Sequence, residues 1–404
     1  MKWPQRKVAD IADLCLGKML DRQKNKGVLR AYLANINVRW GTFELNDLRE
    51  MRFEERELDR YGVRNGDIVM CEGGEPGRCA VWHDQVPGMM IQKALHRIRC
   101  RASVDHRFLY YAFLDFGRAG KFEQFFTGST IKHLPGEKLA IVKVPVPPLD
   151  EQRRIASTLS AYDDLIENNT RRIAILEEMA RRIYQEWFVR FRFPGHEHVR
   201  TAHSELGPVP EGWRVQSLSD VADITMGLSP KGDTYNEVGE GTPLVNGPVE
   251  FGAKFTKAVK WTTAPTKTCK NGDLIVCVRG STTGKYVKSN GRYCLGRGVC
   301  AIHGVQQSFV DHLFIGALPE LLAQTGGSTF PSWTGPQLKS HPVLVPAEHL
   351  MAEFERNVHP MSDAIQVYSR QNANLRTTRD LLLPKLISGE LDVSALPEPE
   401  AVAA

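Results

Sequence analysis

The sequence predicts an α+β protein made of two similar globular units, each followed by a long helix. Two observations support this prediction. Short stretches of the first half of the chain recur in the second half, and each half ends in an uninterrupted pattern of apolar residues typical of paired helices. With 404 residues, the chain is also too long for one ordinary hydrophobic core, so two or more domains are expected.

Composition and charge indicate a soluble globular protein. Hydrophobic residues make up 42% of the chain and charged residues 25%. No apolar run approaches the roughly 20 residues of a membrane span, and the N-terminus lacks the apolar core of a secretion signal, so a cytoplasmic location is expected. The formal net charge of +5 suits a polyanionic partner but is also common among soluble enzymes.

The repeat is clearest in two pairs of stretches. "WPQRKVADIADLCLGK" from Trp3 aligns with "WRVQSLSDVADITMGL" from Trp213 at an offset of 210 residues. "RNGDIVMC" (64–71) aligns with "KNGDLIVC" (270–277) at an offset of 206. Loop insertions and deletions between two copies would produce such a drift.

The helix pattern repeats as well, at an offset of 199. Seam positions recur at alternating steps of four and three residues, which is a strong coiled-coil signal. The expected seam of the first helix is Ile155, Leu159, Tyr162, Ile166, Ile173, Leu176, Ile183 and Trp187. The expected seam of the second helix is Phe354, Val358, Met361, Ile365, Tyr368, Leu375, Leu382 and Leu386. The polar residues Asn372 and Arg379 interrupt the second seam.

Two helices with matched seams most simply bury them against each other. The pattern allows a parallel or an antiparallel pair. About 38 residues at 1.5 Å each span roughly 55–60 Å, so the pair is expected to be a rigid spacer. The alternative is that each helix belongs to the core of a larger domain.

Within each unit, short apolar runs bounded by Gly, Pro and Asn predict strands, among them "GDIVMC", "LAIVKVPVP" and "GDLIVCVRG". Helices are expected over 104–116 and 310–324, and both stretches begin with "VDH". This mixture predicts an α+β unit with glycine-rich polar loops.

Motifs of catalysis are lacking. "GSTTGKY" (280–286) is one residue short of a P-loop, and Tyr286 replaces the hydroxyl residue that would bind Mg²⁺. The eight cysteines include no C-x-x-C pair, and three histidines in 196–203 lack a cysteine partner, so no metal site is expected. No hydrolase or metalloprotease motif is present either. We therefore expect no catalytic residue, no metal and no cofactor in this chain.

The loops of both copies are rich in groups that bind nucleic acid. Lys and Arg neutralise phosphates, while Arg, Asn and Ser/Thr can read base edges in the major groove. The candidates in the first copy are Lys24, Lys26, Arg30, Asn35, Asn37, Arg39, Trp40, Arg78, Ser129, Thr130, Lys132 and His133. The candidates in the second copy are Lys231, Asn246, Arg279, Ser281, Thr282, Thr283, Lys285, Lys288, Ser328, Thr329 and Trp333. Ordinary solvated loops are an equally good interpretation of any single residue, so the prediction depends on the recurrence of similar loops.

The layout and several long motifs resemble the specificity subunits of bacterial type I restriction–modification systems. The motifs are "VPVPPLDEQRRIASTLSAYDDLIENN" (144–169), "GPVPEGWRVQSLSDVADITMGLSP" (207–230) and "LRTTRDLLLPKLISGELDV" (375–393). The resemblance covers nearly the whole chain. One departure is that the second copy has "VPAEHLMAEFERNVHPM" in place of the "PLDEQRRIA" form, so the joint between strand and helix, or its contact with a partner, is expected to differ between the halves.

The resemblance implies two target-recognition domains that each read one half of a split DNA sequence, and two antiparallel spacer helices. The implied parts are target-recognition domains 1–148 and 213–346, spacer helices 149–192 and 347–393, a linker 193–212 and a flexible tail 394–404. Implied partners are double-stranded DNA, two modification (methyltransferase) subunits and restriction subunits. These partners, and not this chain, would bind S-adenosylmethionine, ATP and Mg²⁺. The expected docking surface is the polar face of the first helix, with Arg171, Arg172, Glu177, Glu178, Arg181 and Arg182.

The main hypothesis is therefore a non-catalytic DNA-specificity subunit whose half-sites differ and lie about one helical turn apart, roughly 34–36 Å. One alternative is a single-chain methyltransferase or nuclease fused to a DNA reader, which requires a cofactor or metal site. Another is a coiled-coil scaffold with protein-binding ends, which predicts no DNA protection.

Overall fold

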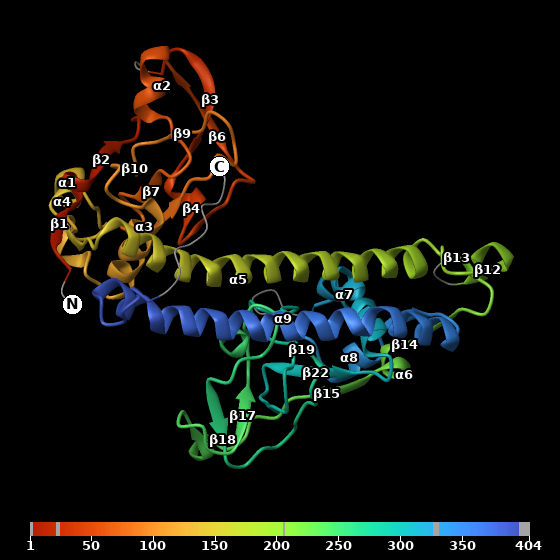
Figure 1. Ribbon diagram of the computed structural model, residues 1–404. Coiled ribbons are helices and arrows are strands. Elements are labelled where there is room, and N and C mark those ends of the chain that lie inside the picture. The colour runs from red at the N-terminus through yellow and green to blue at the C-terminus, as the bar shows by residue number, and fades with distance from the viewer. Residues whose placement is uncertain (1–2, 22–24, 205–206, 326–330, 396–404) are drawn as a thin grey trace. The chain divides into compact units, whose positions relative to one another are not determined.

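The computed structural model describes residues 3–21, 25–204, 207–325 and 331–395 (Figure 1). The chain forms two compact units: unit 1 is Met1–Glu167 with Ala373–Ala404, and unit 2 is Asn168–Asn372. Each unit thus includes part of both long helices, α5 (Leu149–Tyr184) and α9 (Glu348–Ser388). Within the described ranges, no helix is both long and apolar enough to cross a bilayer.

Each unit is built on a four-stranded antiparallel sheet, and the strand order is the same in both. In unit 1 the order is β2 (Ala12–Leu16), β10 (Leu95–Cys100), β7 (Ile68–Cys71) and β8 (Cys79–Val81). In unit 2 it is β15 (Asp223–Met226), β22 (Val299–His303), β19 (Leu274–Cys277) and β20 (Tyr286–Lys288). The duplication predicted from the sequence is therefore a duplication of topology.

The central strands β7 and β19 are buried along their whole length because both faces of each sheet are covered. Ile68 and Met70 face the core that contains the helix α3 (His106–Arg118), whereas Val69 and Cys71 belong to a second core on the opposite face. Burial on both faces explains why these strands are continuous apolar runs, since a sheet with one wet face would alternate.

The helices that cover these sheets begin differently in the two units. Asp105 caps α3, and its carboxylate accepts hydrogen bonds from the N–H groups of Arg107 and Phe108. Its counterpart in the shared "VDH" motif, Asp311, lies inside α7 (Gln307–Ala323) and pairs with Lys288. The expectation that both helices start at "VDH" is correct for α3 and wrong for α7, because Asp311 serves as an ion-pair partner and not as a cap.

Smaller elements complete each unit. Unit 1 adds β1 (Gln5–Lys7) with β11 (Lys143–Pro145), the sheet β6 (Arg49–Phe53)–β3 (Val28–Leu33)–β9 (Met90–Ile91), β4 (Val38–Arg39) with β5 (Thr42–Phe43), α1 (Val8–Ile11), α2 (Glu55–Tyr61) and α4 (Gly136–Ala140). Unit 2 adds β14 (Arg214–Ser217) with β23 (Pro342–Val345), the sheet β16 (Tyr235–Asn236)–β18 (Lys260–Thr262)–β17 (Thr242–Val245)–β21 (Cys294–Leu295), α6 (Leu218–Val221) and α8 (Gly335–Lys339).

The two long helices run antiparallel. In unit 1 the beginning of α5 shares a core with the end of α9, through Leu159 and Leu386 among others. In unit 2 the end of α5 shares a core with the beginning of α9, through Ala180 and Phe354. The structure thus selects the antiparallel arrangement of the two that the heptad pattern allowed, and the predicted fold class is confirmed.

All predicted seam residues are buried or half-buried, and the polar residues of the seam have partners. The Nδ2 atom of Asn169 donates to the Oδ1 atom of Asn372 over 3.1 Å, and Asn372 donates in turn to the hydroxyl of Thr170 over 3.2 Å. Arg379 forms an ion pair with Asp163. Satisfied polar groups can therefore occupy an otherwise apolar seam.

Different residues join the helices to the two units. In unit 1, the buried Gln152 on α5 accepts a hydrogen bond from the N–H of Asp105, the cap of α3. In unit 2, Glu355 on α9 accepts from the N–H and the hydroxyl of Ser308 in the first turn of α7. Both long helices thus bind the start of the neighbouring helix, although the second copy lacks the "PLDEQRRIA" motif.

The segment expected to be a linker contains ordered structure. After a π-helical turn, Gln185–Val189, the chain forms a hairpin of β12 (Thr201–Ser204) and β13 (Gly207–Pro210). Phe193 and Val209 are buried in the core of unit 2.

Candidate nucleic-acid interface

In each unit, four chain segments are held together at one end of the sheet by backbone hydrogen bonds. In unit 1, Glu72 at the start of the glycine-rich loop donates its N–H to the carbonyl of Ala94 (2.8 Å) and accepts from the N–H of Leu134 (2.7 Å). Gln92 donates to the carbonyl of Leu33 at the end of β3 (3.1 Å). These bonds bring the predicted loops 72–78 and 127–133 together.

Unit 2 repeats the same bonds with different residues. Val278 donates to the carbonyl of Gly298 (2.9 Å) and accepts from the N–H of Trp333 (3.0 Å). Gly296 donates to the carbonyl of Val245 at the end of β17 (2.8 Å). The glycine-rich loop 279–284 therefore lies between the turn 296–299 and the segment that precedes α8, just as its counterpart does in unit 1.

Side chains of unit 1 lie close together on this framework. Asn35 donates to the carbonyl of Gly73 over 3.3 Å, and Arg78 donates to the carbonyl of Asn35 over 3.0 Å. Gly74 has a φ of 82°, and a Cβ atom there would lie 2.4 Å from the Asn35 amide nitrogen. Only glycine fits this position. The imidazole of His133 contacts Glu72 at 3.1 Å, which joins the two loops by their side chains as well.

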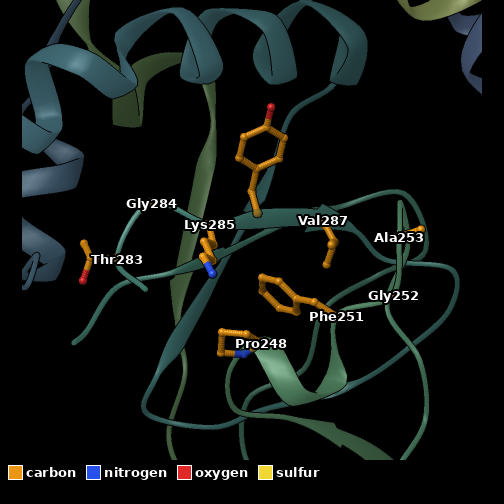
Figure 2. Close-up of a pocket in the computed structure, with 9 residues that line it drawn as sticks. Pro248, Phe251, Gly252, Ala253, Thr283, Gly284, Lys285 and Val287 are labelled. Carbon is orange, nitrogen blue, oxygen red and sulfur yellow. The ribbon is translucent and has the colours of Figure 1, made fainter. Parts of the chain in front are cut away.

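In unit 2, a groove of about 570 Å³ lies beside the glycine-rich loop. Figure 2 shows Pro248 and Phe251 on one side of this groove, beneath the loop that carries Thr283, Gly284 and Lys285. The Thr283 hydroxyl donates over 2.8 Å to the carbonyl of Pro331, so the loop is fixed to the segment before α8. An apolar wall beside an exposed cation is a suitable surface for a base edge and its phosphate.

Two predicted contact residues, Asn37 and Trp333, are buried in structural positions, so these predictions are wrong, and the half-buried Trp40 has a structural contact as well. Asn37 is 4% exposed, and its amide is fully used by the backbone of Ala34, Glu44 and Asp47. Trp333 is buried and donates its indole N–H to the carbonyl of Leu321 over 2.8 Å. Trp40 packs against the core of unit 1 beside Gly117. A polar or aromatic residue in a loop is often there to support the loop, and the sequence alone could not distinguish this use.

The predicted cations fall into two groups. Arg39, Arg78 and Lys288 form ion pairs with Glu44, Glu75 and Asp311, so part of their charge is already compensated. In the part of the chain that the structure describes, the exposed side chains of Lys26, Lys132, Lys231, Arg279 and Lys285 have no ion-pair partner. The second group has its full charge available for phosphate.

The remaining predicted residues are placed as follows. Arg30 lies within β3, while Ser129, Thr130, Asn246 and Ser281 are exposed on the loops and Thr282 is half-buried. Lys24, Ser328 and Thr329 lie outside the described residues.

Burial governs the chemistry of the two thiols in this region. Burial raises the pKa of the Cys71 thiol, against the opposing effect of Arg78, and burial likewise raises the pKa of Cys277. Both thiols are therefore neutral near pH 7, and a neutral thiol is a poor nucleophile. Among the described side chains, no group of three or more His, Cys, Asp or Glu residues is arranged to hold a metal ion.

Two cations that sequence reasoning missed lie in the tight turn of this framework. Lys93 and Arg297 are exposed, and they occupy equivalent positions in the turns 92–95 and 296–299. The similarity between "KALHRI" (93–98) and "RGVCAI" (297–302) at an offset of 204 is the only sequence signal of this equivalence, and it is weak.

Comparison with known proteins identifies relatives of the whole layout. A family model described as "Type I restriction modification DNA specificity domain" matches residues 2–178 and 210–354. The putative type I restriction enzyme MjaX specificity subunit of Methanocaldococcus jannaschii is 28% identical over 63% of this chain and 61% of its own length. The MjaIX specificity subunit of the same organism is 28% identical over 86% of this chain and 83% of its own. The crystal structure of a type I restriction–modification S subunit from M. genitalium has the same fold, with a TM-score of 0.64, 17% identity and 96% of both chains covered.

Proposed function

Since the chain belongs to the type I restriction modification DNA specificity family, we propose that it is a DNA-specificity subunit without a catalytic site of its own. The observation that supports this most directly is the loop framework, which is built twice with the same backbone bonds. Each copy presents glycine-rich loops and exposed polar side chains, the features needed to enter a groove of duplex DNA.

The target we propose is bipartite and asymmetric. The two frameworks share their backbone bonds but differ in the side chains that they present. Ser129, Thr130 and Lys132 are exposed on the loops of unit 1, whereas Asn246, Arg279 and Lys285 are exposed on those of unit 2. Different side chains on equal frameworks read different bases, so the two half-sites differ. The antiparallel helices α5 and α9 set the length of the unread spacer between them.

Catalysis in this proposal belongs to partner chains. Two modification subunits bind S-adenosylmethionine, and restriction subunits bind ATP and Mg²⁺. One docking surface is a shallow groove of about 380 Å³ on α5, lined by Arg171, Ala174, Ile175, Glu178, Met179 and Arg182. Ile175 and Met179 are about half exposed, and an exposed apolar strip flanked by arginines suits a partner with apolar and acidic side chains.

The test is DNA binding by the full chain together with its modification subunits. Genomic methylation mapping first supplies the bipartite motif, and binding is then measured on DNA with both halves intact or with one half randomised. Arg279→Ala should weaken discrimination by about 1–3 kcal/mol at the half-site that unit 2 reads, and leave the other unchanged. Lys339→Ala, an exposed lysine on α8, is the matched control.

Two outcomes would contradict the proposal. Equal binding of cognate and random DNA at about 150 mM salt would exclude sequence-specific recognition. Equal loss at both half-sites in Arg279→Ala would exclude two independent readers. Binding of S-adenosylmethionine to the isolated chain would instead favour a methyltransferase with its own site.

A further inference from the structure

The turns 92–95 in unit 1 and 296–299 in unit 2 have the same hydrogen-bonding pattern. Leu95 donates to the carbonyl of Gln92 (2.9 Å), and Val299 donates to the carbonyl of Gly296 (3.2 Å). The second residue of each turn is an exposed cation, Lys93 in unit 1 and Arg297 in unit 2. The glycine-rich loops are bonded to the third residue of each turn, so both cations lie at the edge of the candidate interface.

The backbone around both cations is rigidly held. The N–H of Lys93 donates to the carbonyl of Lys18 (2.9 Å), and the N–H of Arg297 donates to the hydroxyl of Ser229 (3.1 Å). A glycine lies against each turn: a Cβ atom at Gly17 would lie 2.4 Å from the Gln92 carbonyl oxygen, and one at Gly227 would lie 2.1 Å from that of Gly296. The turn therefore fixes the backbone from which each cation extends.

In unit 2, the neighbours of Arg297 are constrained further. A Cβ atom at Gly296 would lie 2.2 Å from the Asn246 side-chain oxygen, and one at Gly298 would lie 2.0 Å from the Asn246 carbonyl oxygen. These glycines hold the turn tightly against the predicted contact residue Asn246. Because Val278 donates to the carbonyl of Gly298 (2.9 Å), Arg297 also lies next to the segment that leads into the loop carrying Arg279.

Charge compensation separates these two cations from Arg39, Arg78 and Lys288, and groups them with Lys132, Arg279 and Lys285, which also have no ion-pair partner among the described residues. Arg39, Arg78 and Lys288 are engaged by carboxylates of their own unit. Within the described ranges, neither Lys93 nor Arg297 has an ion pair or a side-chain hydrogen bond. Presenting an unpaired cation at the same point of both units requires a common reason.

We propose that Lys93 and Arg297 make equivalent contacts to DNA phosphates, one in each half-site. This inference rests on the proposed function. In the proposed function the two units read different bases, so the only feature common to both half-sites is the phosphodiester backbone. A cation that both units carry at the same position is therefore suited to contact that backbone. The exchange of Lys for Arg between the copies agrees with this assignment, because either side chain neutralises a phosphate, whereas a bidentate contact to guanine would favour Arg.

The experiment compares Lys93→Gln and Arg297→Gln with the natural chain, each in complex with its modification subunits. The dissociation constant is measured from about 50 to 300 mM salt, on cognate DNA and on DNA with either half-site randomised. Loss of one phosphate contact should reduce the slope of log K against log salt by about 0.9, and weaken binding roughly fivefold near 150 mM salt. The loss should be equal on all DNA sequences. Arg297→Lys should bind like the natural chain.

Matched controls are Lys7→Gln and Arg214→Gln, exposed cations on the separate two-stranded sheets β1–β11 and β14–β23, whose salt slope should not change. Unchanged slopes in both test variants would overturn the inference while leaving the proposed function intact. Relaxed base preference in Arg297→Gln without rescue by Arg297→Lys would also overturn it, because Arg297 would then read a base. A natural complex that does not distinguish cognate from random DNA would instead refute the proposed function.

Discussion

Arg379 on α9 provides the sharpest test of how the helix pair is held. Its side chain is only 14% exposed and forms ion pairs with Asp163 on α5 and with Asp380. Asp163 also accepts a hydrogen bond from the hydroxyl of Tyr111 on α3 (2.7 Å), and Asp380 pairs with Arg118 on the same helix (2.5 Å). One charged network therefore connects three helices of unit 1.

The expected cost of removing Arg379 follows from the exposure of its partner. Removing one partner of a fully buried ion pair costs about 3–5 kcal/mol, because the other charge is left buried and uncompensated. The Asp163 side chain is 31% exposed, so water replaces part of the lost interaction. Arg379→Met should therefore cost about 2–3 kcal/mol. In a unit of roughly 200 residues this corresponds to a fall in Tm of about 5–10 °C.

The assay is thermal and urea unfolding of the full chain carrying Arg379→Met, Asp163→Asn or both substitutions. Each single variant leaves one group without its partner, whereas the double variant does not. The double variant should therefore lose about 1–2 kcal/mol less free energy of unfolding than the two single losses added together. Arg172→Met is the control, because Arg172 lies exposed on α5 over the ring of Tyr368 and should cost less than 1 kcal/mol. Strictly additive losses would refute the proposed network.

Three further predictions concern stability. Ile166→Asp would place a charge in the buried seam and should cost several kcal/mol, so an unchanged Tm would contradict the paired helices. Phe354→Ala should lower the free energy of unfolding by about 3–5 kcal/mol, because this buried ring contacts Tyr184 of α5 and Phe309 of α7. Urea unfolding measures the loss, and a loss below about 1 kcal/mol would indicate that the core collapses around the cavity. Burial lowers the pKa of His96 and of His312, so these side chains bind fewer protons in the folded state than in the unfolded state. The stability that they contribute is fully present above about pH 6.5 and should be lost as the pH falls below that value. Urea unfolding at pH 7.5 and 5.5 measures this effect, and higher stability at pH 5.5 would contradict it.

The sequence was sufficient to predict the duplication, the fold class and the helix seams, because each of these produces a periodic or repeated pattern of residues. The stretches "RNGDIVMC" and "KNGDLIVC" both form a tight turn followed by a strand that is buried on two faces, and such burial restricts which residues are acceptable. Heptad spacing similarly reports the face that a long helix buries. The direction of pairing was not readable, since parallel and antiparallel helices use the same spacing.

The contact residues could not be predicted with equal success, because their use depends on contacts that are remote in sequence. Trp333 was assigned to the interface, but its indole N–H satisfies a carbonyl of α7 and its ring fills the core. Asp311 shares the "VDH" motif with Asp105 but pairs with Lys288 and caps nothing. The same residue type in the same short motif can have two uses, and three-dimensional neighbours decide between them.

The duplication also offers a way to separate scaffold from recognition within a single chain. Backbone bonds that recur in both units, such as those of Glu72 and Val278, are required by the framework whatever DNA sequence is read. Side chains that differ at equivalent positions are free to specify different bases. Cations that recur, as Lys93 and Arg297 do, are those that we propose to contact the phosphate backbone, which any two stretches of duplex have in common. The two units therefore serve as controls for each other, and a variant that affects both half-sites alike distinguishes the shared contacts from those that specify sequence.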